Sequence, residues 1–231
     1  MTAAPGALPD HFERVRQAIP ATVTLIAVTK FLPVETIRAA YGQGLRHFGE
    51  SRVQEAIAKQ ADLTDLSDIT WHLIGHLQTN KARKAVEHFH WVHSVDSLKL
   101  AQRLDQAAQE LGKAPQCCLQ VKLVPDPPKS GIDAAELLSL LPQFDQLEHL
   151  KLRGLMTIPP QGASPDMVQA VFDGAKALAD TINQGGFNRL RIDQLSMGMS
   201  GDYPAAIACG ATMVRLGTVL LGARPPSPEL G

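Results

Sequence analysis

Cysteine is scarce in this chain of 231 residues. Only Cys117, Cys118 and Cys209 are present, and none lies in a C-x-x-C or a paired cysteine–histidine spacing. Such spacings hold zinc, and a disulfide framework needs an even set of spaced cysteines. We therefore expect no metal site and a reducing compartment. Cys117 and Cys118 are interpreted as packing residues on opposite faces of one strand.

An excess of charge of either sign is also missing. Lys plus Arg number 22 and Asp plus Glu number 23, which gives a formal net charge of −1. Nucleic-acid binding needs clustered basic residues, so this balance gives no reason to expect it. The N-terminus lacks a basic region and an apolar run, and Arg215 interrupts the longest apolar stretch near the C-terminus. We expect a cytoplasmic protein without a membrane partner.

Short apolar, β-branched runs alternate with amphipathic stretches from about residue 22 to the C-terminus. This alternation is typical of βα units and a parallel sheet. The intervening segments show the apolar spacing and the capping residues of helices. The eight runs are 22–28, 46–48, 71–74, 91–95, 116–123, 151–158, 194–197 and 212–216.

Eight strand signals, each followed by a helix signal, leave about 26 residues per unit, near the lower limit for a closed (β/α)8 barrel. A doubly wound open sheet is the alternative. It would more often bring a G-x-G-x-x-G turn after the first strand, and none is present. The α/β fold that we predict is a single TIM-type barrel domain over 1–231. A helix is expected within 1–20 and a loose tail at 225–231.

Several helix starts are predicted from capping patterns. Ser51-x-x-Gln54 and Asp133-x-x-Glu136 have the spacing of a capping box. Ser164 precedes a proline, which is favoured at the first helical position. The helix after Ser164 is expected to bury one apolar stripe, formed by Met167, Val171, Gly174, Leu178 and Ile182.

Function is expected at the C-terminal ends of the barrel strands, where the βα loops build one face. The first run is followed directly by Thr29 and Lys30. An ammonium group at the rim of an apolar barrel mouth is desolvated, which lowers its pKa and frees the amine for imine formation. An ordinary rim lysine is the alternative, and Lys30 alone does not decide between them.

Two glycine–hydroxyl segments follow the last two runs. The first contains Ser200, which is expected to cap a short helix over 202–209, and the second contains Gly217 and Thr218. Free N–H groups and hydroxyls bind anions, and barrels frequently bind phosphate in these loops. Each segment alone is also compatible with a plain glycine-rich turn.

Lys30 and these loops are expected to lie side by side, because the eighth strand of a closed barrel pairs with the first. One ligand that carries an aldehyde and a phosphate would reach both, and pyridoxal 5'-phosphate has both groups. Met197 and Met199 are interpreted as residues of the barrel core or wall.

Other polar residues near strand ends keep two interpretations each. His76, just past the third run, is either a general base or a loop residue that orients its neighbours. Lys81 is either a cation of the active face or a helix surface charge. Lys129, Ser130 and Gly131 either reach an anionic ligand or close a turn.

Seven motifs, spread from about residue 25 to residue 224, carry a family resemblance. They are LIAVTK, HFGESRVQEA, WHLIGHLQTNK, HSVD, KSGI, GLMTIP and LSMGMSGDYPAAIACGATMVRLGTVLLGAR. In this order they resemble the pyridoxal phosphate homeostasis proteins, and the last motif is the most specific. The resemblance implies a barrel like the N-terminal domain of alanine racemase, with the cofactor in imine linkage to Lys30.

The same resemblance implies the other cofactor contacts. Ser200, Gly217 and Thr218 would hold the phosphate, and Arg215 would face the pyridine nitrogen. A guanidinium keeps its proton, so it hydrogen-bonds an unprotonated ring nitrogen and leaves the ring a weaker electron sink. Without the resemblance, Arg215 would fit a rim ion pair equally well. Ser51 stands where the family usually has asparagine, and we expect this shorter side chain at the cofactor site.

The resemblance favours a protein of vitamin B6 homeostasis that binds pyridoxal phosphate without substantial catalysis. Pyridoxal-phosphate-dependent enzymes would be the recipients, and we expect a monomer. The family carries His or Pro at position 76, which favours the orienting role because proline transfers no proton. Barrel racemases of this fold take a second acid/base tyrosine from a C-terminal domain. Tyr41 and Tyr203, the only tyrosines here, are interpreted as residues of helices.

Two alternatives stay open. The first is an enzyme, either a small amino-acid racemase or a Schiff-base lyase that uses Lys30 without a cofactor. In the lyase, Ser200 and Thr218 would bind the phosphate of the substrate. The second is an interaction module whose ligand reports the cofactor level to a partner.

Overall fold

Parallel strands form the centre of the molecule, which a computed structural model describes for residues 8–125 and 130–223. Every strand pair among the described residues is parallel. All eight runs expected from the sequence contain strands, and the two-residue β6 is the one strand of the described residues that was not expected. The strands are β1 (Thr24–Val28), β2 (His47–Glu50), β3 (Thr70–Leu73), β4 (Trp91–Val95), β5 (Gln116–Lys122), β6 (Ile132–Asp133), β7 (Lys151–Met156), β8 (Gln194–Ser196) and β9 (Met213–Leu216).

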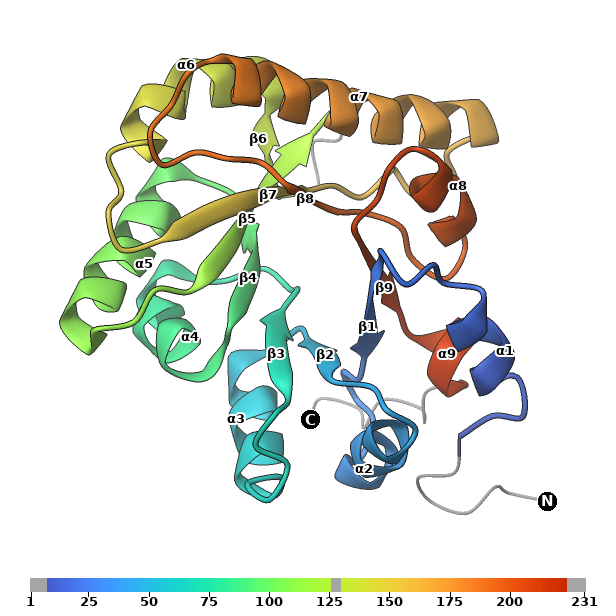
Figure 1. Ribbon diagram of the computed structural model, residues 1–231. Coiled ribbons are helices and arrows are strands. Elements are labelled where there is room, and N and C mark those ends of the chain that lie inside the picture. The colour runs from blue at the N-terminus through green and yellow to red at the C-terminus, as the bar shows by residue number, and fades with distance from the viewer. Residues whose placement is uncertain (1–7, 126–129, 224–231) are drawn as a thin grey trace, which may run out of the picture.

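The sheet closes on itself. Its order is β4-β3-β2-β1-β9-β8-β7-β5, with β4 also paired to β5 and with β6 paired to β5. Figure 1 shows β1 beside β9, and their register places Ile26 opposite Arg215. The predicted (β/α)8 barrel is confirmed, and the open sheet is excluded because β1 and β9 are hydrogen-bonded neighbours.

Helices surround the barrel (Figure 1). They are α1 (Phe12–Gln17), α2 (Val34–Gly42), α3 (Val53–Ala61), the 3-10 helix η1 (Thr79–Lys81), α4 (Ala82–His88), α5 (Leu98–Leu111), α6 (Ala134–Phe144), α7 (Pro165–Gln184), α8 (Tyr203–Ala208) and α9 (Thr218–Leu221). The tail expected at 225–231 lies outside the described residues. Within the described ranges, no helix is both long and apolar enough to cross a membrane.

The helix starts agree with the sequence in part. Ser164 caps α7, since its hydroxyl accepts a hydrogen bond from the Met167 N–H at 3.3 Å. Asp133 occupies the N-cap position of α6, but its side chain makes no capping hydrogen bond. The stripe on α7 is buried at Val171, Leu178 and Ile182, whereas Met167 is 41% exposed and does not belong to it.

Two hydrophobic clusters lie on the two faces of the barrel wall. The larger one packs the strands against the helices and includes Cys117. Cys118 belongs to the smaller one, as expected for neighbours that point to opposite faces of a strand. Met197 is buried in the wall, but Met199 is 36% exposed, so the interpretation of Met199 as core was wrong. The smaller cluster comprises Ile26, Trp91, Cys118, Met156 and Met213.

Candidate functional site

The turn after β1 carries Lys30 on a strained backbone. Thr29 is fully buried and Lys30 is half-buried. Phe31, the next residue, has a φ of 63°, a left-handed conformation that bulky residues rarely adopt. The Phe31 N–H donates to Glu55 Oε1 at 2.7 Å. Such strain persists only where surrounding contacts hold it, and it clusters at functional sites.

A buried ion-pair cluster holds this turn. Lys59 Nζ donates to Glu50 Oε1 at 2.8 Å, to Glu55 Oε1 at 2.7 Å and to the Thr29 carbonyl at 2.8 Å. The Thr29 hydroxyl also donates to Glu50 Oε1, at 2.7 Å. Buried charges are costly unless they are paired and hydrogen-bonded, so these contacts fix the backbone on both sides of Lys30.

The sequence reasoning missed this cluster. Glu50 is fully buried at the end of β2, and burial raises its pKa while Lys59 opposes that shift. Its second carboxylate oxygen has no hydrogen-bond partner among the described residues. The available signal was Lys59 itself, because it lies four residues after Glu55 on the apolar face of a predicted helix, where an unpaired lysine is unexpected.

Arg215 lies in the barrel interior beneath the mouth and is 4% exposed. Its Nη1 donates to the Ser196 carbonyl at 2.6 Å and to Ser196 Oγ at 2.7 Å, and its Nη2 donates to the Thr157 carbonyl at 3.2 Å. The salt bridges of the described residues do not include Arg215. Burial lowers the pKa of Arg215 to about 10. The guanidinium is therefore a buried donor that forms no salt bridge among the described residues, and the alternative of a rim ion pair has no support there.

The loops that follow β8 and β9 meet. Ser200 Oγ accepts a hydrogen bond from the Val219 N–H at 3.4 Å, which joins the β8 loop to the first turn of α9. Gly217 is buried directly before α9, and Thr218 is exposed at its first position. Hydroxyl and backbone N–H groups from two loops are thus gathered at one end of β9.

Ser200 does not cap α8, which corrects the sequence prediction. Asp202 occupies the N-cap position, and its Oδ1 accepts a hydrogen bond from the Met199 N–H at 2.6 Å. The loop also depends on Gly198, which has a φ of 93° and whose Cβ, if present, would lie 2.6 Å from the Ala206 Cβ. The carboxylate closes the turn before α8, so the Ser200 hydroxyl is free to contact α9.

Ser51 lies too early to cap α3, which begins at Val53 with Arg52 at the N-cap position. The capping box predicted there is wrong. Ser51 instead packs so closely on Gly75 that a Cβ at position 75 would lie 2.3 Å from the Ser51 carbonyl oxygen. Ser51 lines a pocket of about 300 Å³ together with His76 and other residues that follow β2 and β3.

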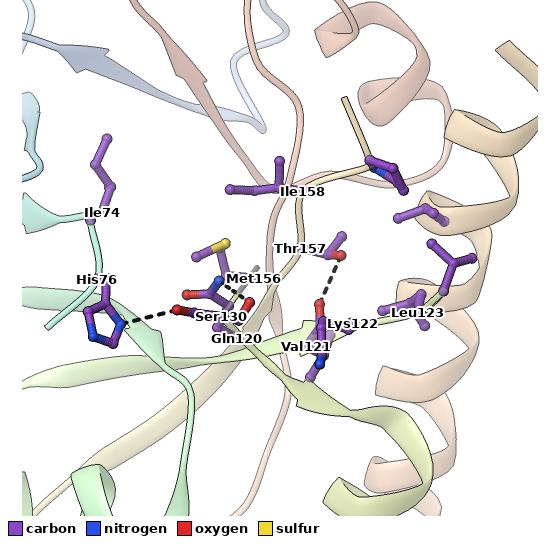
Figure 2. A pocket seen from close by; sticks show the side chains of 14 residues that line it. Ile74, His76, Gln120, Val121, Lys122, Leu123, Ser130, Met156, Thr157 and Ile158 are labelled. Atoms are coloured by element: carbon purple, nitrogen blue, oxygen red, sulfur yellow. Dashed lines mark hydrogen bonds between the residues drawn. The ribbon is translucent and has the colours of Figure 1, made fainter. Parts of the chain in front are cut away.

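A second pocket, of about 360 Å³, opens where β3, β5 and β7 end (Figure 2). Two of its hydrogen bonds tie the strand ends together. Thr157 Oγ1 donates to the Val121 carbonyl at 3.1 Å, and Gln120 Nε2 donates to the Ser130 carbonyl at 2.7 Å. The remaining lining is largely apolar and includes Met156 and Ile158.

His76 joins three loops at this mouth. Its Nδ1 lies 2.9 Å from Asp96 Oδ2 and 3.2 Å from Ser130 Oγ, and its side chain is 58% exposed (Figure 2). These contacts match a loop residue that orients its neighbours. Lys81 ends η1 and lines the same pocket as Ser51. Lys129, the third candidate here, lies outside the described residues.

The candidate cofactor residues share one side of the barrel. β8, β9, β1 and β2 are consecutive neighbours in the closed sheet. Each of these strands contributes to the set at or near its C-terminal end, where parallel strands of a barrel place their functional groups. The set comprises Lys30 after β1, Ser51 after β2, Ser200 after β8, Arg215 in β9, and Gly217 and Thr218 after β9.

Comparison with known proteins agrees with this architecture. The family model of the alanine racemase N-terminal domain matches residues 5–225. The alanine racemase of Clostridium difficile is 16% identical, covers 93% of this chain and 56% of its own, and has a TM-score of 0.74, so it shares the fold. Fold and site define a barrel of the alanine racemase N-terminal class.

More similar proteins narrow this class. A Synechocystis relative, named pyridoxal phosphate homeostasis protein, is 52% identical over 94% of this chain and 98% of its own length. A Pseudomonas aeruginosa relative of the same name is 46% identical over 91% of each chain. PipY of Synechococcus elongatus, solved with pyridoxal phosphate bound, is 55% identical over 92% of this chain and 99% of its own, with a TM-score of 0.88. This chain belongs to the pyridoxal phosphate homeostasis protein family.

Proposed function

We propose that this protein binds pyridoxal 5'-phosphate covalently through Lys30 and takes part in intracellular vitamin B6 homeostasis. Membership of the family and the pyridoxal phosphate bound to PipY support the proposal. The observation that carries it is the environment of Arg215. Three of its N–H donor contacts are to neutral oxygens, and its charge forms no salt bridge among the described residues. A ligand with a ring nitrogen and a phosphate supplies the missing acceptor and negative charge.

Each candidate residue has a role in this proposal. The Lys30 amine condenses with the aldehyde and releases water, and Arg215 donates a hydrogen bond to the ring nitrogen. Ser200, Gly217 and Thr218 hold the phosphate where the two loops meet, and Ser51 contacts the cofactor from the β2 side. When bound, pyridoxal phosphate supplies an electron-withdrawing ring, and Arg215 weakens it as a sink by keeping its nitrogen unprotonated.

We also propose that the protein holds the cofactor for other enzymes, as a monomer in the cytoplasm, without substantial turnover of its own. Racemisation needs a proton donor on each face of the reacting carbon. Tyr41 donates its hydroxyl proton to Asp68 at 2.5 Å on an exposed surface, and Tyr203 packs against the hydrophobic core. Incubation of the loaded protein with L-alanine should give no D-alanine above the rate of free pyridoxal phosphate. A clear rate that is lost in Lys30→Ala would establish the racemase alternative.

The attachment is tested by visible absorption of the purified protein before and after borohydride, with Lys30→Ala and Lys81→Ala beside it. Lys81→Ala is the matched control, since it removes another lysine at the same end of the barrel. We expect a yellow band that borohydride bleaches in the parent and in Lys81→Ala but that is missing from Lys30→Ala. A parent protein that shows no such band after incubation with pyridoxal phosphate and removal of the unbound cofactor would refute the proposal.

A further inference from the structure

A continuous hydrogen-bonded chain crosses the barrel interior and ends at Arg215. His47 Nδ1 lies 3.0 Å from His72 Nε2, and His72 Nδ1 lies 2.9 Å from His93 Nε2. His93 Nδ1 lies 2.8 Å from Ser196 Oγ, to which Arg215 Nη1 donates at 2.7 Å. His47, at the start of β2, is half-buried, whereas the other four residues are buried. The chain therefore connects the N-terminal end of the barrel with the proposed cofactor site.

The donor and acceptor roles along this chain follow from its last member. Arg215 has donors only, so Ser196 Oγ must accept from it. The Ser196 hydroxyl then has one hydrogen to give, and His93 Nδ1 is its neighbour. A neutral imidazole that accepts at Nδ1 carries its proton on Nε2, so His93 donates to His72 Nδ1. His72 accepts at Nδ1, so it carries its own proton on Nε2 and donates it to His47 Nδ1.

Hydrogen-bond donation in the opposite direction, from the histidines toward Arg215, is less favourable. If His93 donated from Nδ1 to Ser196, the Ser196 oxygen would accept twice and its hydrogen would lack a described acceptor in a fully buried place. A buried donor without an acceptor keeps the full cost of its lost hydration, so this arrangement is disfavoured. Donation in a single direction, from Arg215 toward His47, gives the Ser196 hydroxyl and the Nε2–H groups of His93 and His72 an acceptor each.

The histidines of the chain are neutral. Burial and the nearby Arg215 guanidinium lower the pKa of His93 to about 3. Burial, followed by the effect of His93, holds the pKa of His72 well below its ordinary value, and burial lowers that of His47. Trp91 lies parallel to His72, with ring centroids 6.0 Å apart and planes at 10°, and so packs an apolar face against the imidazole.

We propose that Arg215 imposes one tautomer, protonated at Nε2, on His93, His72 and His47, and that this chain in return holds Arg215 in place. Ser196, His93 and His72 are thus positioning residues for the guanidinium. The purpose of this positioning rests on the proposed function, because the ring nitrogen is the group that Arg215 would face. The tautomers themselves do not depend on any ligand.

The tautomers are read from the imidazole nitrogen shifts of ¹⁵N-labelled protein at neutral pH, with and without added pyridoxal phosphate. We expect His72 and His93 to carry their proton on Nε2 in both samples. In His72→Phe, His93 should keep its tautomer, because the order is set from the Arg215 end. A proton on Nδ1 of either histidine, or loss of the His93 tautomer in His72→Phe, would overturn the proposal.

The positioning role is tested with Ser196→Ala, and Ser94→Ala is its matched control. Ser94 is equally buried, next to His93 on β4, and its hydroxyl has no described hydrogen-bond partner. Ser196→Ala should mix the His93 tautomers and speed exchange of the Arg215 guanidinium protons by roughly tenfold, as expected for one lost hydrogen bond. It should also raise the Kd for pyridoxal phosphate by roughly tenfold. Ser94→Ala should change none of these.

Equal effects of the two serine variants on exchange would overturn the positioning role, since any buried hydroxyl would then matter as much. An unchanged Kd in Ser196→Ala, with parent binding intact, would overturn it as well. If the parent protein binds no pyridoxal phosphate, the proposed function fails. The tautomers and the exchange of the Arg215 guanidinium protons still test the proposed hydrogen-bonded chain in that case, because both are measured without the ligand.

Discussion

Around Lys30, some functional residues could be predicted from the sequence and others could not. Lys30 was identified because it directly follows a buried strand, a position that a linear pattern reveals. Glu50 and Lys59, which hold its turn, were missed because their pairing joins a strand end to the next helix. His72 and His93 were missed for the same reason. Each looks like an isolated polar residue in its own strand, and only closure of the barrel brings them together.

Loss of Lys59 should be costly, because it leaves the buried Glu50 carboxylate without its partner. Lys59→Met is expected to lower the free energy of unfolding by about 3–5 kcal/mol. The double variant Lys59→Met/Glu50→Gln should recover part of this loss, since no buried charge remains. Urea unfolding followed by circular dichroism measures both, with the exposed Lys84→Met as control. A loss below about 1 kcal/mol in Lys59→Met would show that the cluster does not stabilise the turn.

At the scale of elements, strands were predicted better than helix starts. The apolar pattern and the length of a run predict a buried parallel strand, and eight such strands in succession predict a closed barrel. A helix start depends on which of several nearby polar groups reaches the backbone N–H groups. Asp202 and Arg52 occupy the N-cap positions of α8 and α3 without side-chain capping hydrogen bonds, and neither Ser200 nor Ser51 is a cap. The loops that these serines occupy were nevertheless expected at the correct end of the barrel.

The β8 loop should tolerate little change at Gly198. Gly198→Ala forces a left-handed φ on alanine and places its Cβ 2.6 Å from the Ala206 Cβ. We expect a loss of about 1–3 kcal/mol in stability and weaker binding of pyridoxal phosphate, because α8 must shift. Gly201→Ala is the control, since a Cβ there meets nothing within 4 Å. Similar losses of stability in both variants, measured by thermal unfolding, would contradict this explanation.

The molecule as a whole should lose stability in mild acid. His93 has a pKa of about 3 when folded, against 6.5 for an unperturbed histidine. The unfolded chain therefore binds more protons below pH 6.5, so stability is complete above that pH and falls as the pH decreases. His93 alone accounts for about 2 kcal/mol at pH 5. His72 and His47 add to this loss, whereas the raised pKa of Glu50 acts in the opposite direction.

Urea unfolding between pH 8 and pH 5 measures this effect. His93→Gln should have a flatter pH dependence than the parent, because it removes one buried group that resists protonation. Stability that stays constant down to pH 5 in the parent would show that the histidine chain accepts protons without penalty, against the burial described for its members.

The most direct test of the central claim is the location of the bound cofactor. Borohydride fixes the adduct, and digestion with mass spectrometry then identifies the modified peptide. We expect the phosphopyridoxyl group on Lys30 and on no other lysine of the barrel mouth. A group found on Lys81 or Lys122 while Lys30 stays unmodified would contradict the assignment of the site.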